Sequence, residues 1–129
     1  FSVAGRRILL VEDNDLNAEI AMELLKEEGL QVERANDGVL CIEMVESAPA
    51  NYYDLILMDI QMPIMDGYRA TQMIRKLQDP IKAEIPIVAM TANAFAEDRE
   101  KALSVGMNGH VAKPLELNKL NEIMRTWLG

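Results

Sequence analysis

The chain has 129 residues, half of them hydrophobic, and its 13 basic and 21 acidic side chains give a formal net charge of −8. This length fits one domain, and the acidic balance argues against nonspecific binding of nucleic acid. No apolar run of the sequence approaches the ~20 residues of a membrane helix. The single cysteine, Cys41, excludes an intramolecular disulfide. A lone cysteine fits a reducing compartment, so we expect a cytoplasmic domain that contacts neither nucleic acid nor membrane directly.

The start of the chain does not have the character of a signal peptide, because its charges precede only a strand-length apolar run. We interpret residues 1–5 as the remnant of a linker and residues 6–129 as one domain. The domain is then expected to be a segment of a longer parent chain, and a membrane anchor elsewhere in that parent is compatible with this expectation.

Five short segments of strand character alternate with helical patterns. The predicted strands are 7–11, 31–35, 54–58, 86–90 and 109–112. The first, third and fourth are nearly continuous apolar runs, as expected for central strands covered on both faces, whereas 31–35 is more polar and suits an edge. Strands that alternate with helices predict βαβ units with right-handed crossovers, and therefore a parallel sheet.

Five helices are predicted between and after these strands. The first is expected to be capped by Asp15 and to end at Gly29, and the residues it would bury are Leu16, Ile20, Ala21, Leu24 and Leu25. The others cover about 38–48, 68–74, 94–105 and 117–128, and the last has a clear amphipathic stripe.

Acidic residues end two of the central strands. Asp59 closes the run that begins at Asp54, and Glu12 and Asp13 follow the first strand. A buried carboxylate is costly unless it is paired or does chemistry. Because the carboxyl ends of parallel strands form the usual ligand crevice, three carboxylates are expected to converge there on a divalent metal, with Asp59 as candidate nucleophile. The alternative for Glu12 and Asp13 alone is an ordinary loop that caps a helix.

Two further strands end in groups suited to a phosphate site. Thr91 ends the fourth strand, and its hydroxyl can donate to a phosphoryl oxygen. Lys113 follows the fifth strand, where an ammonium can pair with Asp59 or with a phosphoryl group. Taken singly, an ordinary strand threonine and a solvated lysine are the alternatives. Pro114 makes the Lys113–Pro114 bond a candidate cis peptide.

These residues resemble the receiver domain of two-component signalling. The resemblance covers about residues 6–128 and is carried by Val11-Glu12-Asp13-Asn14, by Asp59 within the segment 58–67, by Thr91-Ala92 and by Lys113-Pro114. It implies a flavodoxin-like, doubly wound α/β fold with a five-stranded parallel sheet of order 2-1-3-4-5 and five helices. The segments 11–17 and 90–94 look most like receivers of hybrid sensor histidine kinases and phosphorelays.

The resemblance also implies a nucleophile and a metal site. Asp59 would accept a phosphoryl group from a phosphohistidine on a partner. Mg²⁺, or Mn²⁺ in its place, would be held by Asp13, Asp59 and the backbone carbonyl of Gln61, with Glu12 acting through water. The domain would catalyse its own phosphoryl transfer without being a turnover enzyme alone.

Binding of the phosphoryl group and the response to it fall to other residues in this resemblance. Thr91 and Lys113 would bind the phosphoryl oxygens, and Thr91 would move together with His110, the only histidine. Many family members have Tyr or Phe at the latter position. Taken without the resemblance, His110 is a partly buried strand residue, and a lone histidine is not expected to bind metal.

The expected partner is a histidine kinase or a histidine phosphotransfer domain, docked by the first helix. The face made by 94–105, 109–112 and 117–128 would read out the change and offers a homodimer surface. Three alternatives stay open: a phosphate-independent interaction module, an aspartate-nucleophile phosphatase, and a flavodoxin-like FMN carrier. The phosphatase would need a second aspartate where Gln61 stands, and the carrier would need a Ser/Thr/Gly-rich first loop.

Overall fold

The computed structural model describes residues 3–92 and 96–128. The strands are β1 Arg7–Val11, β2 Gln31–Ala35, β3 Leu55–Asp59, β4 Ile87–Thr91 and β5 Gly109–Ala112. The helices are α1 Asp15–Glu27, α2 Gly38–Ser47, α3 Gly67–Arg75, α4 Pro80–Ala83, α5 Ala96–Ser104 and α6 Leu117–Leu128. Each predicted strand is present, and β3 and β4 are shifted by one residue so that Asp59 and Thr91 belong to them.

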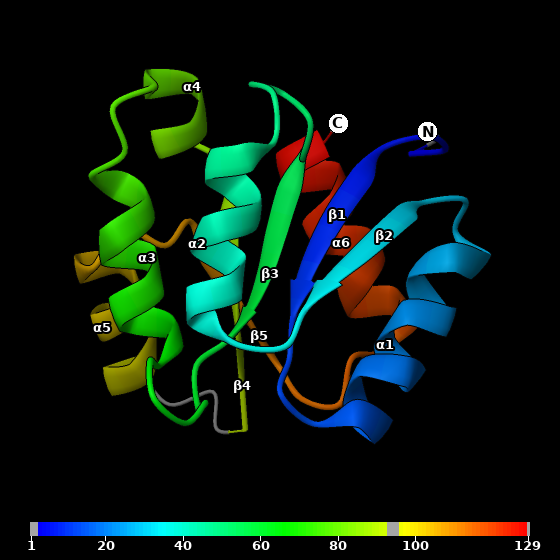
Figure 1. Cartoon of the computed structure of the whole chain (residues 1–129). Helices are drawn as coiled ribbons and strands as arrows, with labels where there is room; N and C mark the ends of the chain where they lie inside the picture. The colour runs from blue at the N-terminus through cyan, green and yellow to red at the C-terminus, as the bar shows by residue number, and fades with distance from the viewer. Residues whose placement is uncertain (1–2, 93–95, 129) are drawn as a thin grey trace.

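All neighbouring strands pair in parallel, in the order β2-β1-β3-β4-β5 (Figure 1). The predicted fold class and strand order are therefore confirmed. The expected number of helices is wrong, because the described residues contain six. The additional helix, α4, is a single turn whose N-cap Asp79 accepts a hydrogen bond from the Ile81 N–H. So short a turn leaves no apolar periodicity for the sequence to display.

Two layers of helices cover the sheet (Figure 1). On one face, Leu9 and Ile56 belong to the core formed with α2, α3 and α5. On the other, Leu10 and Leu57 belong to the core formed with α1 and α6. Side chains alternate between the two faces along a strand, so strands covered on both sides are apolar at nearly every position.

Helix α1 departs from its prediction in two ways. Its N-cap is Asn14, whose side-chain oxygen accepts a hydrogen bond from the Asn17 N–H, so Asp15 is the first helical residue rather than the cap. Leu16 and Ile20 are 65% and 54% exposed. Ala21 and Leu25 are buried as predicted, and Ala18 completes the buried stripe. Small alanines on that stripe let the helix lie close to the sheet.

Other helix boundaries follow their sequence signals more closely. Asp37 caps α2 and accepts a hydrogen bond from the Leu40 N–H. The predicted start of the helix near Ala94 lies outside the described residues. Within the described residues, α5 begins at Ala96. At the amino end, Val3 of the predicted linker remnant is buried in the core beside α1 and α6.

Arg75, at the end of α3, joins this helix to the segments 83–85 and 106–108. Its guanidinium donates to the carbonyls of Gly106, Ala83 and Ile85 and to the side-chain oxygen of Asn108, over 2.7–2.9 Å. Burial lowers the pKa of this guanidinium. These bonds fix the amino end of the sheet, opposite the acidic end.

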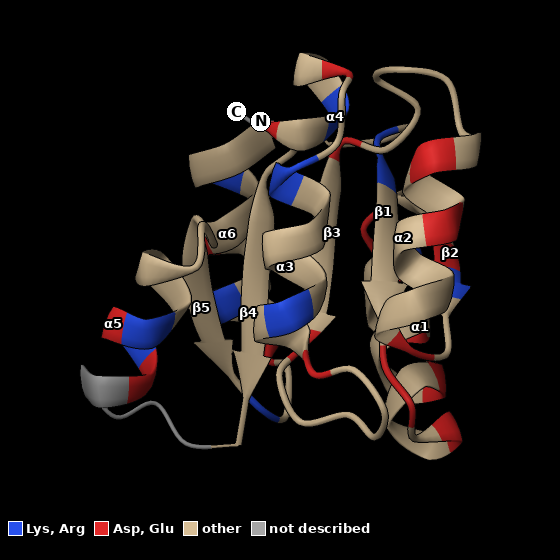
Figure 2. Cartoon of the chain, turned by 60° about the vertical axis from the view of Figure 1, so that its left-hand side comes forward, with Lys and Arg blue, Asp and Glu red and all other residues tan. Residues whose placement is uncertain are grey.

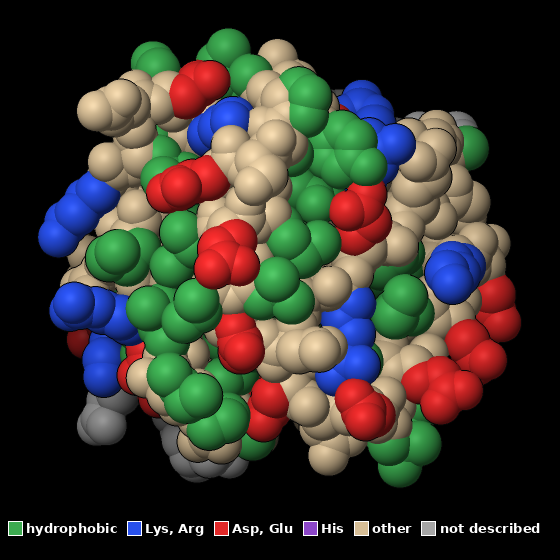
Figure 3. Space-filling model, viewed as in Figure 1, with side chains coloured by type: hydrophobic (Ala, Val, Ile, Leu, Met, Phe, Trp, Pro, Cys, Tyr) green, Lys and Arg blue, Asp and Glu red, His purple; other side chains and the backbone are tan. Residues whose placement is uncertain are grey.

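Acidic segments gather in the loops beyond the carboxyl ends of β1 and β3 (Figure 2). On the face seen in Figure 3, acidic and basic side chains are interspersed with apolar ones. Among the described residues, no helix combines the length and apolar character that crossing a bilayer requires.

Candidate active site

Three carboxylates meet at the carboxyl end of the sheet. Asp59 is the last residue of β3 and only 3% exposed, and Glu12, directly after β1, is 2% exposed. Asp13 follows and is exposed. One carboxylate oxygen from each of the three lies within 4.8 Å of the others. Because β1 and β3 are neighbours, the parallel register brings together residues that are 47 positions apart in the chain.

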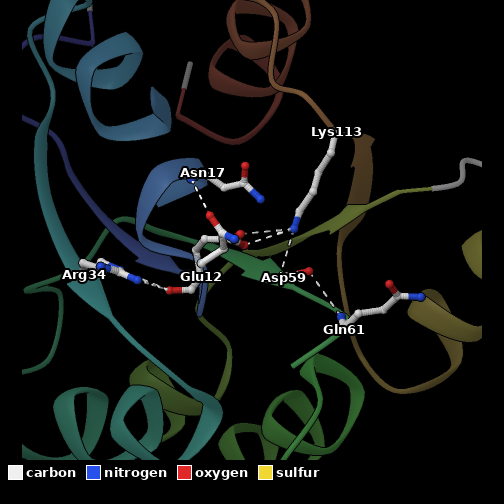
Figure 4. A network of polar contacts seen from close by, with 7 residues as sticks. Glu12, Asn17, Arg34, Asp59, Gln61 and Lys113 are labelled. Carbon is white, nitrogen blue, oxygen red and sulfur yellow. Dashed lines mark hydrogen bonds and ion pairs between the residues drawn. The ribbon is translucent and has the colours of Figure 1, made fainter. Parts of the chain in front are cut away.

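Lys113, directly after the edge strand β5, completes this cluster. Its Nζ lies 3.0 Å from Asp59 Oδ2 and 3.1 Å from Glu12 Oε2 (Figure 4). The Lys113 backbone N–H donates to the Thr91 carbonyl over 2.8 Å, which fixes the chain just beyond β5. The Lys113–Pro114 peptide bond is cis, the conformation for which the sequence made it a candidate. One ammonium group thus bridges two nearly buried carboxylates.

The cluster shifts the proton affinities of its members. Burial, and then the adjacent Glu12 carboxyl, raise the pKa of Asp59 to about 7, against the opposing influence of Lys113. For Lys113, burial alone would lower the pKa, but the contacts with Asp59 and Glu12 outweigh it and raise the pKa. Lys113 does not fully offset the crowding of the carboxylates, so added positive charge would favour the ionised form of Asp59.

The loop after β3 packs tightly around Asp59. The Gln61 backbone N–H donates to Asp59 Oδ1 over 3.2 Å, and the Gly67 N–H donates to the Ile60 carbonyl over 2.9 Å. A Cβ at Gly67 would lie 2.4 Å from the Asp59 carbonyl oxygen, so only glycine fits there. At the exposed tip of the loop, Ile64 has a φ of 70°. The backbone carbonyl of Gln61, predicted as a metal ligand, belongs to this same loop.

Thr91 and His110 lie on the two strands beyond Asp59. Thr91 ends β4, one strand from Asp59, and is 7% exposed. His110 is half-buried on β5 and lines a hollow of about 410 Å³ together with Arg99 and Trp127. The structure therefore brings Glu12, Asp59 and Lys113 into direct contact and places His110 on the side of α5 and α6.

An apolar groove of about 310 Å³ adjoins the polar cluster. Ile20 of α1, Met90 of β4 and Leu115 beyond β5 line it, and Glu12 and Lys113 also border it. The exposed side of α1 thus continues into a groove that leads to the cluster.

Arg34 is a member of the site that sequence reasoning missed. It lies on β2, and its guanidinium donates two hydrogen bonds to the Glu12 carbonyl (Figure 4). A third hydrogen bond goes to the Asp15 carboxylate. The polar character of β2 indicated an exposed edge, and no motif singled this arginine out.

A family model described as the response regulator receiver domain matches residues 8–125. The chain belongs to this family. The predicted recognition is therefore confirmed, and the carboxylate cluster lies at the carboxyl end of a receiver sheet.

The relatives of this receiver include long histidine kinases. It is 44% identical over 123 residues to hybrid signal transduction histidine kinase B of Dictyostelium discoideum, a match that covers 88% of this chain and 6% of that protein. It is 38% identical over 117 residues to the signal transduction histidine-protein kinase BarA of Escherichia coli, covering 91% and 12%. The chain thus spans only a small part of the curated relatives it matches.

Solved receiver structures are similar over nearly the whole chain. One is the receiver domain of sensor histidine kinase PA1611 from Pseudomonas aeruginosa, with a magnesium ion in its active site cleft; it is 40% identical, with a TM-score of 0.85 over 98% of this chain and 99% of that one. Another is the Ssk1 receiver of Saccharomyces cerevisiae with the histidine phosphotransfer protein Ypd1, at 28% identity, with a TM-score of 0.86 over 96% and 89%.

Proposed function

We propose that this receiver takes a phosphoryl group from a phosphohistidine onto Asp59 in a transfer that needs Mg²⁺. The observation that carries the proposal is the Lys113 ammonium 3.0 Å from Asp59, within a cluster of three carboxylates. In the reaction an Asp59 carboxylate oxygen attacks phosphorus, the P–N bond breaks, and the donor imidazole leaves with its electron pair and takes a proton. The product is an acyl phosphate.

The donor set fits a hard divalent cation. Asp13, Asp59 and the Gln61 carbonyl would hold it, and Glu12 would act through water. All these ligands are oxygens, which Mg²⁺ prefers, and Mn²⁺ accepts a similar set. When bound, the ion would neutralise charge on the phosphoryl oxygens.

The chain's own groups would position and neutralise the rest of the charge. Phosphoryl transfer passes through a loose transition state with negative charge on the equatorial oxygens. Lys113 is already held beside Asp59 and would exchange that carboxylate for a phosphoryl oxygen. The Thr91 hydroxyl, at the end of the adjacent strand, would donate to another. The Gln61 N–H would keep Asp59 Oδ1 oriented.

The phosphodonor would be a histidine kinase or a histidine phosphotransfer domain. The exposed Leu16 and Ile20 of α1 and the groove that runs to Lys113 offer an apolar docking surface beside the nucleophile. A helical donor laid across this surface would bring its phosphohistidine over Asp59. The co-crystal structure of Ypd1 with the Ssk1 receiver supports a phosphotransfer protein as partner.

The response would spread from Asp59 toward β5. The new phosphoryl group would add about −1.5 to −2 charge. Thr91 would shift toward the phosphoryl group, and the His110 side chain would turn inward into the space that Thr91 leaves. The face formed by α5, β5 and α6 would then change, either to bind an effector or to pair with a second copy. The domain would act in the cytoplasm within a longer parent such as a hybrid sensor histidine kinase.

The test is intact mass spectrometry after incubation with acetyl phosphate, with and without Mg²⁺. We expect a Mg²⁺-dependent, hydroxylamine-labile gain of one phosphoryl group in the wild type, which Asp59→Asn abolishes. Asp54→Asn is the matched control, since Asp54 directly precedes the amino end of β3, opposite Asp59. The Asp54→Asn variant should still be labelled. Labelling that persists in Asp59→Asn would refute the assignment of the nucleophile.

A second donor separates this function from the alternatives. If acetyl phosphate gives no adduct, a phosphorylated histidine phosphotransfer domain is tested in the same assay. No adduct from either donor would favour the phosphate-independent interaction module. Multiple turnover of a phosphoester would favour the phosphatase, and a yellow protein with a flavin spectrum would favour the FMN carrier.

A further inference from the structure

Arg34, on the edge strand β2, binds the backbone of the acidic loop that begins at Glu12 and Asp13. Its Nε and Nη2 donate to the Glu12 carbonyl over 3.1 and 2.9 Å, and Nη1 lies 2.9 Å from Asp15 Oδ1. The Arg34 side chain is 20% exposed, whereas the Asp15 side chain is 93% exposed. The contact with the carbonyl is therefore the sheltered one, and the ion pair faces solvent.

Residues of β2 hold both the N–H and the carbonyl of Glu12. The Glu12 N–H donates to the Ala35 carbonyl over 3.2 Å, and its own carbonyl accepts both bonds from Arg34. The Glu12 carbonyl belongs to the peptide that leads into Asp13. Its orientation therefore limits the directions in which the Asp13 side chain can leave the backbone.

Electrostatic repulsion works against this arrangement. The carboxylates of Glu12, Asp13 and Asp59 lie within 4.8 Å of one another, and Asp13 is the exposed member with room to swing away. A ligand that must be pulled back on binding lowers metal affinity, because part of the binding free energy is used for ordering. Residues that orient metal ligands from outside raise affinity for the same reason.

We propose that Arg34 is a positioning residue for the metal site: its forked contact with the Glu12 carbonyl holds Asp13 where it can ligate the ion. The inference rests on the proposed function, since it needs a metal bound by Asp13. Lysine cannot replace arginine here, because a single ammonium does not reproduce the planar fork.

Charge and position make opposite predictions for this residue. Arg34 is a cation close to an acidic metal site, so its charge alone opposes Mg²⁺, and removing it would tighten binding. If the fork positions the loop, removing it weakens binding. The direction of the change therefore separates the two roles.

The experiment is calorimetric titration of Mg²⁺ into the metal-free full chain. We expect Arg34→Gln and Arg34→Lys to raise the Mg²⁺ dissociation constant about tenfold, the usual order for loss of a residue that orients metal ligands. Asp15→Asn removes the exposed ion pair but keeps the fork, and should change the constant less than about twofold, as befits a surface ion pair. Arg6→Gln, at the opposite end of the sheet, is the matched control for loss of a cation and should leave the constant unchanged.

A second readout follows the loop without metal. In metal-free Arg34→Lys, the backbone amide signals of Asp13 and Asn14 should shift and exchange faster with solvent, while those of β4 stay as in the wild type. This comparison stands even if Arg34→Gln does not fold.

Unchanged or tighter Mg²⁺ binding in Arg34→Gln would overturn the inference, and wild-type affinity in Arg34→Lys would overturn the need for the fork. Either result in a protein whose wild type binds Mg²⁺ leaves the proposed function intact. Absence of Mg²⁺ binding by the wild type would overturn both.

Discussion

Replacing Asp59 by asparagine should stabilise the metal-free domain, and the gain should increase with pH. The pKa of Asp59 is raised from 3.8 to about 7 in the fold, first by burial and then by Glu12. Between these two values the unfolded chain releases the proton while the folded chain keeps it. Stability from this group is therefore lost as the pH rises toward 7 and then levels off. Asparagine cannot ionise, so the variant escapes that loss.

The magnitude follows from the width of the pH interval. Each pH unit between the unfolded and folded pKa values changes the free energy of unfolding by about 1.4 kcal/mol. From pH 5.5 to pH 7 the gap between Asp59→Asn and the wild type should widen by about 1.6 kcal/mol, less than the full slope because the folded state begins to release the proton below pH 7. The lost ion pair with Lys113 offsets part of the absolute gain, but Lys113 keeps Glu12 at 3.1 Å.

The assay is urea unfolding followed by far-UV circular dichroism, in buffers with a chelator at pH 5.5, 6.25, 7 and 8. A gap that stays constant from pH 5.5 to pH 8 would refute the reasoning, because Asp59 would then titrate alike in both states. As a control, Mg²⁺ at about 100 times its dissociation constant should stabilise the wild type by about 2.7 kcal/mol and the variant by less.

Three further predictions concern the scaffold, and urea unfolding checks each. Gly67→Ala should cost about 2–3 kcal/mol because its Cβ would lie 2.4 Å from the Asp59 carbonyl, whereas Gly109→Ala, with no atom nearer than 3.6 Å, should cost little; equal costs would contradict this. Ile64→Asn should stabilise by about 1 kcal/mol, since Ile64 is exposed and has a φ of 70°, and a loss of stability would count against backbone strain there. Arg75→Gln should cost about 2–4 kcal/mol, because the carbonyls it joins lose their donor, and a change within 0.5 kcal/mol, about the size of a neutral surface substitution, would show that they find others.

The order of the sheet and the position of the site were predictable because both depend on strands. A short apolar run that ends in a polar residue marks a strand and its carboxyl end together. Parallel pairing then brings such ends to one edge without any knowledge of side-chain conformation. Glu12 and Lys113 are 101 residues apart and nevertheless form an ion pair, as this reasoning requires.

Features that depend on side-chain size and direction were less predictable. On α1 two stripes compete at helical spacing, and hydrophobicity alone favours the larger residues, Leu16 and Ile20. The sheet selects Ala18, which the sequence analysis did not single out, together with the predicted Ala21, since a helix packed closely over strands needs small side chains. The role of Arg34 depends on the register of an edge strand and on the reach of one long side chain, neither of which has a pattern in the sequence.

The exposed residues Leu16 and Ile20 of α1 and the raised pKa of Asp59 together bear on how the proposed transfer would be controlled. The site holds three carboxylates and one nearby ammonium group, Lys113, and burial and Glu12 raise the pKa of Asp59, the proposed nucleophile, to about 7. A protonated carboxyl is a poor nucleophile. In the proposed transfer, competence would depend on further positive charge entering the cluster, whereas the proposed donor surface, Leu16 and Ile20 of α1, is already exposed. Docking and chemistry would then be controlled separately, and a partner could bind the metal-free domain without phosphorylating it.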